Sequence, residues 1–406
     1  MSAPLAANFF RHEYGRLVAI LVRRVGARHL EAIEDGVQSA LLAAVHAWPR
    51  SKVPENPSAW LYRVAHHHVV GELRRSSRHG ELAAEHVRGA EPVADLVTAS
   101  LSGDLGDDLL RMLFVCCDDA IPIEAQLVLA LKTLCGFDVA EIAERLFITE
   151  ANVYKRLARA RLRMRDVPLL AADLSGDQLA SRRSAVHAIL YTLFTEGYLS
   201  SHADGAIRRE LCEEALRLAT LLAEHPVGAT PETYALLALM HLHSARLPAR
   251  QDGSGGLLLL EEQDRSRWDP VEIQAGLVWL ARAAEGDVFT RYHAEAGIAA
   301  EHCLAPSFVA TRWDRIVACY ELLERLAPSA LHALNRAVAV AEHRGPEHGL
   351  AVLAGLEPPS WLLGSYQWSA VLSDLHRRAG HGEMARQCRE SALEAAPSSV
   401  IREALA

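Results

Sequence analysis

The sequence predicts an almost entirely α-helical protein, and three observations support this fold class. Half of the 406 residues are apolar, aromatic residues make up only 6%, and alanine and leucine dominate. Alanine and leucine have high intrinsic helix propensities, whereas runs of β-branched residues are short. No segment shows the strict alternation of a strand over a useful length. We therefore expect an all-α fold.

The length and the composition of the loops divide the chain into several helical parts. A chain of 406 residues is too long for one ordinary core. Helical periodicity runs, with breaks, from Phe9 to about Ser76, and a polar, acidic stretch that contains glycine follows it. We predict a first helical domain at 1–80, an acidic linker at 81–108, a second helical domain at 109–165, a connector at 166–184 and an array of roughly ten helices at 185–406.

The net charge of −9 is distributed unevenly along the chain. Residues 1–90 contain 12 Lys/Arg against 8 Asp/Glu, and residues 125–165 contain 8 against 4. The residues between them contain 1 against 8, and residues 166–406 contain 21 against 31. Local patches decide contact with nucleic acid more than total charge does. The two basic modules are therefore the expected DNA-binding parts of an otherwise acidic protein.

Several classes of protein do not fit this sequence. Its apolar stretches are too short to cross a bilayer, and its N-terminus lacks the basic start and apolar centre of a signal peptide. We therefore expect a cytoplasmic protein.

The seven cysteines are odd in number and show no CxxC spacing, which argues against a disulfide framework or a zinc ribbon. No P-loop, dinucleotide-binding turn, HExxH or GxSxG motif is present, so we expect no enzymatic activity, cofactor or metal.

The segment 138–165 has the pattern of a helix-turn-helix. Asp138 and Glu141 form a capping-box-like start, and Thr149 can cap the second helix. Periodicity places three apolar residues of that helix inward: Val153, Leu157 and Ala160. The opposite face carries long hydrogen-bond donors: Asn152, Lys155, Arg156, Arg159 and Arg163. Such a face suits the major groove, although a solvated basic face on an ordinary helix pair is the alternative.

The segment 57–75, PSAWLYRVAHHHVVGELRR, is the second motif. A helical projection places Trp60, Arg63, His67 and Arg74 within one narrow sector. An aromatic ring among cations suits single-stranded DNA, because rings stack on bases and cations attract the backbone. The alternative is that Trp60 anchors a core. The three consecutive histidines point about 100° apart, so they do not converge on a metal ion.

Near the C-terminus the sequence contains a weak helical repeat. The spacing of Leu372, Gly380, Ala385, Ala392 and Pro397 fits a tetratricopeptide helix pair, in which small residues let two helices pack closely. Another segment of this part is dense in charge. The pattern favours a self-satisfied ion network at a helix boundary, and the functional alternative is a contact with another domain or a partner through Glu262, Asp264, Arg265, Arg267 and Trp268.

Taken together, the motifs resemble the extracytoplasmic-function sigma factors. The segment IEDGVQSALLAAVHAW, the Trp60 helix, the acidic linker and the helix-turn-helix occur in the order of that family, and together they cover residues 1–165. Strings such as LFTEGY, RRELCEEALRLA and LLEEQDRSRWD resemble a subgroup with a tetratricopeptide-like C-terminal extension. The resemblance implies an alternative bacterial sigma factor that binds core RNA polymerase and promoter DNA.

The resemblance also implies roles for individual residues. Contact with the clamp helices of the polymerase β′ subunit is implied for Asp35, Gln38 and Leu41. Contact with the promoter −10 element is implied for Trp60, Arg63, His67, Arg74 and Arg75. Entry into the −35 major groove is implied for Asn152, Lys155, Arg156, Arg159 and Arg163. The β flap and a small YCII-like regulatory protein are further implied partners.

Two positions depart from the family pattern. His67 stands where the family usually has asparagine, and Gly71 stands where it often has aspartate. The −10 preference therefore does not follow from the resemblance. A conventional helix-turn-helix repressor with a ligand- or partner-binding helical domain is the alternative function, but it leaves the Asp35 and Trp60 helices unexplained. The acidic C-terminal domain is expected either to inhibit or to support activity.

Overall fold

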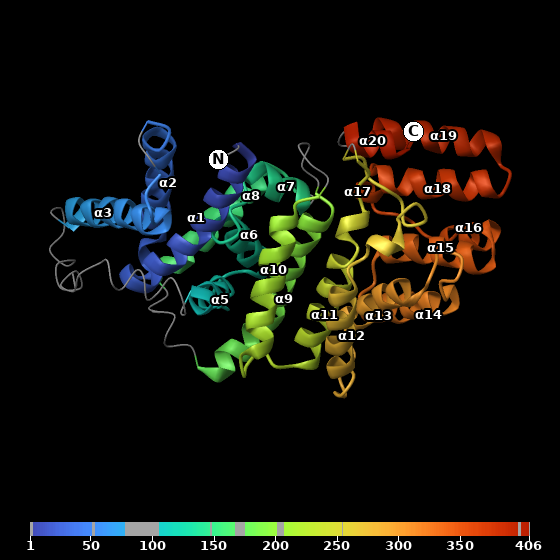
Figure 1. Cartoon of the computed structure of the whole chain (residues 1–406), viewed down its shortest axis with the longest axis horizontal. Helices are drawn as coiled ribbons and strands as arrows, with labels where there is room; N and C mark the ends of the chain where they lie inside the picture. The colour runs from blue at the N-terminus through green and yellow to red at the C-terminus, as the bar shows by residue number, and fades with distance from the viewer. Residues whose placement is uncertain are drawn as a thin grey trace. The chain divides into compact units, whose positions relative to one another are not determined.

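The computed structural model describes residues 3–50, 53–77, 105–146, 148–166, 175–200, 207–253, 255–396 and 399–405. All named elements in these ranges are helices, apart from one isolated antiparallel bridge between Gln251 and Leu257. The predicted all-α fold is therefore confirmed. The chain divides into two compact units, Met1–Leu193 and Phe194–Ala406 (Figure 1). Most of the predicted linker at 81–108 lies outside the described residues.

The first part of the N-terminal unit is a bundle of three long helices. They are α1 (Ala3–Val25), α2 (Leu30–Ala47) and α3 (Pro57–Ser77), with the short 3₁₀ helix η1 (Ala27–His29) before α2. Helices α2 and α3 pack closely because Gly36 has no side chain. A Cβ atom there would lie 2.6 Å from Val69 Cγ2 and 3.1 Å from the Ala65 carbonyl oxygen. Leu61, Ala65 and Val69 on α3 are fully buried against this contact.

The second part of the N-terminal unit holds the helix-turn-helix. Its helices are α5 (Leu105–Cys116), α6 (Ile123–Thr133), α7 (Val139–Arg145) and α8 (Glu150–Asp166). The capping box at Asp138 is confirmed, because its Oδ1 accepts from Glu141 N and its own N donates to Glu141 Oε2, both at 2.7 Å. Thr149 Oγ1 accepts from Asn152 N at 3.3 Å. Phe147, in the predicted turn, lies outside the described residues.

These two bundles pack directly on each other within the N-terminal unit. Helix α1 contacts α5 and α6, and α8 contacts η1 and α2. The closest approach is at Gly15 on α1, where a Cβ atom would lie 2.0 Å from the Leu134 carbonyl oxygen. Helix α9 (Gly176–Tyr198) starts within the predicted connector. Its buried Arg182 donates to Asp118 Oδ2 at 2.5 Å and to the Phe114 carbonyl at 3.1 Å, so α9 is fixed to the second bundle by a buried ion pair.

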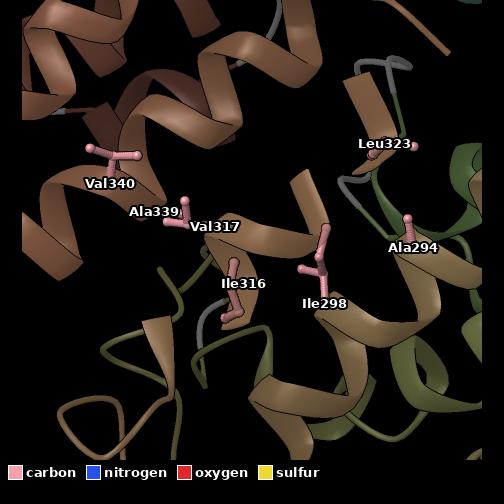
Figure 2. Close-up of a cluster of buried hydrophobic side chains, with 7 residues drawn as sticks. All are labelled: Ala294, Ile298, Ile316, Val317, Leu323, Ala339 and Val340. Atoms are coloured by element: carbon pink, nitrogen blue, oxygen red, sulfur yellow. The ribbon is translucent and has the colours of Figure 1, made fainter. Parts of the chain in front are cut away.

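The C-terminal unit is a succession of short helices in which chain neighbours pack on one another. They are α10 (Arg209–Glu224), α11 (Pro231–Ser244), α12 (Pro270–Ala283), α13 (Arg291–Leu304), α14 (Trp313–Leu326), α15 (Ala330–Arg344), α16 (Pro346–Leu353), α17 (Ser360–Leu363), α18 (Tyr366–Arg378), α19 (Gly382–Glu394) and α20 (Ser399–Leu405). Figure 2 shows a core where α13, α14 and α15 meet, built from Ala294, Ile298, Ile316, Val317, Leu323, Ala339 and Val340.

The helix pair predicted near the C-terminus is formed by α18 and α19, which lie side by side in Figure 1. Gly380, in the turn between them, has a φ of 80°, a conformation that favours glycine. Ala385 and Ala392 are buried, and Leu372 packs on the neighbouring core cluster. Small residues therefore allow the close packing that the spacing predicts. Pro397 lies outside the described residues.

Between α11 and α12 the chain makes a long excursion before it returns to its starting point. Asp269 N donates to the Ala245 carbonyl at 2.9 Å and closes the excursion. Two short 3₁₀ helices, η4 (Leu247–Ala249) and η5 (Arg265–Arg267), are its regular elements. Connections in compact domains are usually about 4–6 residues long, and much longer ones often carry function. None of the helices that the structure describes is both long and apolar enough to span a bilayer.

Candidate nucleic-acid interface

Helix α8 has one buried face and one cationic face, as its sequence predicts. Val153, Leu157 and Ala160 are buried in the second bundle. The predicted DNA-reading residues follow the opposite face, where all are exposed except Arg156, which is half-buried: Asn152, Lys155, Arg156, Arg159 and Arg163. Tyr154, which the sequence analysis did not single out, is 60% exposed on the same helix. The exposed face of α8 therefore presents hydrogen-bond donors and one aromatic ring to a binding partner.

Helix α3 presents a second cationic face. Four of the residues predicted for the −10 element are exposed: Arg63, His67, Arg74 and Arg75. Trp60 is half-buried and meets the ring of Trp48 edge-on, with the centroids 5.7 Å apart. Trp60 is therefore partly a core anchor and partly accessible. Arg75 pairs with Glu72 at 2.8 Å, a contact between two exposed side chains that another partner can replace.

The three consecutive histidines of α3 have three different environments. His66 stacks on Tyr62 with the ring centroids 5.7 Å apart, and burial, followed by the nearby His67 and Arg24, lowers the pKa of His66. His67 is exposed, and His68 Nε2 lies 3.4 Å from Ser39 Oγ. In the described part of the chain, no group of three or more His, Cys, Asp or Glu side chains is placed to hold a metal ion.

Helix α2 carries the residues predicted to contact the polymerase. Asp35 and Gln38 are exposed, and Leu41 is half-buried. The structure adds Leu42, 59% exposed, and Val45, 49% exposed, on the same helix. Their positions follow Asp35 and Gln38 at helical spacings of three and four. The sequence signal for them was present, because apolar residues on an otherwise polar helix face suit a protein partner.

The same helix is also joined to α8. Glu34 is buried and accepts hydrogen bonds from Arg161 Nη2 at 2.5 Å and from Thr133 Oγ1 at 2.9 Å. Glu31 pairs with Arg165 at 2.6 Å. These pairs hold the C-terminal half of α8 against α2, while the predicted reading face of α8 stays exposed. The sequence analysis did not identify this contact, because the paired residues lie far apart in the chain.

The charge-dense segment of the excursion is built differently from an ion network. Asp264 Oδ1 accepts from Ser266 N at 2.9 Å, and Glu262 Oε2 accepts from Leu259 N at 2.7 Å. Trp268 is buried, and Arg265 donates to the backbone carbonyls of His302 and Ala305. Arg267 is exposed. Within the described residues no ion pair at hydrogen-bonding distance joins these side chains, although the charge of Arg267 contributes to the lowered pKa of Asp264 after the hydrogen bonds from Ser266.

Comparison with known families assigns the modules. Residues 9–79 match sigma-70 region 2, residues 112–164 match sigma-70 region 4, and residues 182–284 match DUF6596, a family of unknown function. The first bundle, with the α2 and α3 faces, is thus a sigma region 2 domain, and the helix-turn-helix is a region 4 domain. These are the domains of a sigma factor.

Two relatives show which proteins the chain is similar to over a longer stretch. It is 33% identical to the uncharacterized protein R00370 of Rhizobium meliloti over 374 residues, which cover 92% of this chain and 88% of the relative. The chain therefore belongs to the same family as R00370. It is also 28% identical over 157 residues to the ECF RNA polymerase sigma factor SigM of Mycobacterium tuberculosis, covering 39% of this chain and 74% of SigM. No solved structure matches the chain.

Proposed function

We propose that this protein is an alternative sigma factor of the extracytoplasmic-function type. It binds core RNA polymerase and directs it to promoters, using region 4 for the −35 element and region 2 for recognition and melting of the −10 element. The observation that carries the proposal is that two exposed cationic helix faces, on α3 and α8, belong to the two sigma domains. The protein acts by binding rather than by enzymatic catalysis, and it works in the cytoplasm, where its template is.

In this proposal α8 enters the −35 major groove. Arg and Lys side chains there reach phosphates or guanine edges, and Asn152 reads adenine. Helix α3 places Trp60 and Arg63 at the −10 element, where an accessible ring stacks on an unpaired base, an interaction worth about 1–3 kcal/mol per base. The exposed His67 occupies the place where most of the family has asparagine, so it sets a −10 preference particular to this chain.

The polymerase-binding surface is the exposed side of α2. Asp35 and Gln38 supply polar contacts to the β′ clamp helices, and Leu41, Leu42 and Val45 supply apolar contact area. Region 4 contacts the β flap in the same assembly. A mixed surface of this kind suits a protein partner, because apolar residues supply contact area and the charged residue supplies orientation.

The C-terminal unit is a tetratricopeptide-like extension that regulates or supports the sigma modules. Residues 194–406 contain 19 Lys/Arg against 28 Asp/Glu, a charge opposite to that of the basic modules. Consecutive helix pairs such as α18 and α19 give it the architecture of a helical repeat, which usually offers a groove to a partner. A small YCII-like protein is the partner that the family resemblance suggests.

Binding of the full-length chain to purified core RNA polymerase tests the proposal. We expect tight binding by the wild type and a reduction of about tenfold or more, on the order of 1.4 kcal/mol, for Asp35→Ala. Asp177→Ala is the matched control, because Asp177 is an exposed acidic residue on another helix of the same unit and its loss should leave affinity unchanged. Binding is measured by fluorescence anisotropy of labelled sigma protein.

Two results would count against it. Unchanged binding by Asp35→Ala would show that α2 is not the polymerase surface. If the wild type does not bind core polymerase but binds a palindromic operator by itself, the chain is the helix-turn-helix repressor that the sequence analysis kept as an alternative.

A further inference from the structure

The excursion between α11 and α12 carries three arginines without a paired counter-charge, Arg246 and Arg250 near its start and Arg265 near its end. Arg246 and Arg265 both lie over the Trp268 ring, and the charges of Arg246 and Arg250 both act on His243. Among the residues that the structure describes, no carboxylate lies within ion-pair distance of any of the three. The lack of a paired carboxylate is unusual, because a cation removed from water is normally paired with an anion or neutralised.

Arg246 is the most deeply placed of the three. It is 8% exposed, and its Nε and Nη2 atoms donate long hydrogen bonds, 3.4 and 3.3 Å, to the neutral Oε1 of Gln263. Its guanidinium carbon lies 5.3 Å from the centre of the Trp268 ring. A side-chain amide and a π-face stabilise a guanidinium, but neither cancels its charge.

Arg265 lies over the same tryptophan, with its guanidinium carbon 4.5 Å from the ring centre. Its Nη1 donates to the carbonyls of His302 and Ala305, while its Nη2 is buried without a hydrogen-bond partner in the described residues. Arg250 lies 3.7 Å above the ring of Tyr198, and its Nε is likewise buried and unpartnered there. Aromatic rings therefore position the guanidinium groups of Arg250 and Arg265, and one N–H group of each has no hydrogen-bond acceptor in the described residues.

Four of the five acidic residues of the excursion accept hydrogen bonds from backbone N–H groups. Asp252 accepts from Gly256 N at 2.8 Å, and Asp269 accepts from Val271 N at 2.8 Å, in the same way as Glu262 and Asp264. These carboxylates keep their negative charge, so residues 246–269 hold five carboxylates against four arginines, but within the described residues none of the five lies within ion-pair distance of Arg246, Arg250 or Arg265. Burial, followed by the nearby Arg246, lowers the pKa of Arg265, and burial together with Arg246 and Arg265 lowers the pKa of His302 to about 3.

Further polar atoms around the arginines are buried without a partner in the described residues. They are Trp268 Nε1, His243 Nδ1, His302 Nδ1 and the Tyr198 hydroxyl. Buried polar groups are normally satisfied by protein, water or a ligand. Several unsatisfied groups around three like charges indicate that a component with the opposite charge completes this site.

We propose that Arg246, Arg250 and Arg265 form a binding site for an oxyanion, the phosphoryl or carboxylate group of a small molecule. Planar guanidinium forks match the oxygens of either group, and the indole N–H of Trp268 adds a donor. Three positive charges favour a multiply charged anion, so phosphate is the better match of the two. The ligand is small, because a nucleic-acid backbone requires an exposed basic stripe, whereas here Arg246 is buried and the other two arginines are half-buried.

A groove of about 950 Å³ lies beside this site and shares His302 with it. Its lining includes Leu259, Leu260 and Glu261 of the excursion and Trp313 of α14, but none of the three arginines. His302 therefore belongs both to the groove wall and to the surroundings of Arg246 and Arg265. The inference goes beyond promoter recognition, since it gives the DUF6596 domain a ligand of its own and makes the chain responsive to a metabolite.

Thermal unfolding of the full-length chain tests the site, with inorganic phosphate and citrate as probes and sodium chloride at matched ionic strength as the reference. We expect phosphate or citrate at millimolar concentration to raise the Tm by at least about 2 °C over chloride. Arg246→Met should abolish that shift. In buffer without these anions, Arg246→Met should melt no lower than the wild type, because the substitution removes an unpaired buried charge.

Arg282→Gln is the matched control. Arg282 also stacks on aromatic rings, with its guanidinium carbon 4.4 Å from the ring centres of both Tyr234 and Trp279, but it is exposed on α12. This variant should keep the full anion-dependent shift. A response to phosphate alone or to citrate alone supports the site and identifies the oxyanion group. No shift with either anion, or an equal shift in Arg246→Met, overturns the proposal, and neither result bears on polymerase binding.

Discussion

The two units contain buried arginines in opposite electrostatic surroundings. In the N-terminal unit, the Arg182 side chain is 3% exposed and pairs with Asp118 at 2.5 Å. In the C-terminal unit, Arg246 is 8% exposed, and within the described residues its side-chain acceptor is an uncharged glutamine. Burial alone therefore does not give an arginine its role. A counter-charge supplied by the fold makes it structural, and the lack of one indicates that an external anion completes its surroundings.

The largest expected effect comes from removing the cation of the buried Arg182–Asp118 ion pair. Arg182→Met leaves Asp118 buried without its cation, and such a loss costs about 3–5 kcal/mol of unfolding free energy. Native-state hydrogen exchange of the α5 and α9 amides measures that free energy for this unit alone. Arg75→Ala is the control: its pair with Glu72 is exposed and contributes less than about 1 kcal/mol. Equal losses in the two variants would contradict the structural role of Arg182.

A second measurement uses pH to test the surroundings of the unpaired Arg246 and Arg265, through the neighbouring His302. The pKa of His302 is lowered to about 3 in the folded chain, first by burial and then by Arg246 and Arg265. The unfolded chain therefore binds a proton near pH 6.5 that the folded chain does not. Stability from this group is complete above about pH 6.5 and falls continuously as the pH drops towards 3.

Between pH 6.5 and pH 5 the wild type should lose about 2 kcal/mol more unfolding free energy than His302→Phe does. Hydrogen exchange of the α13 amides, in buffer without phosphate or carboxylate, measures the difference. Parallel pH profiles for the two proteins would show that neither burial nor the arginines suppress protonation of this histidine.

The smallest expected effect concerns the ion pair between the two sigma domains. Glu34→Gln keeps an oxygen that accepts from Thr133 but removes the charge opposite Arg161, whose side chain is 28% exposed. A double-mutant cycle with Arg161→Gln should give a coupling of about 1 kcal/mol. Glu31→Gln should change little, because both side chains of the Glu31–Arg165 pair are about half exposed. A coupling near zero for Glu34 would mean that other contacts hold the domains together.

The features that could be predicted from the sequence depend on neighbouring residues. The caps at Asp138 and Thr149 and the buried face of α8 follow from spacings of three and four, so periodicity was sufficient for them. The contact of Glu34 with Arg161 spans 127 residues, and no local pattern encodes it. The local density of charged residues in the sequence singles out the segment with Arg265 and Trp268. No local pattern singles out Arg246, because its role depends on burial and on the lack of a paired carboxylate, which are properties of the folded chain.

Gly15 gives the N-terminal unit a further property. The backbone of α1 touches the Leu134 carbonyl where no side chain fits, so the region 2 and region 4 domains meet at a point with no room for even one methyl group. A methyl group added there would have to displace the Leu134 carbonyl or shift α1 relative to the end of α6. The separation of the two sigma domains at this point is therefore set by the absence of a side chain, and Gly15→Ala changes that separation without replacing any residue proposed to touch DNA or polymerase.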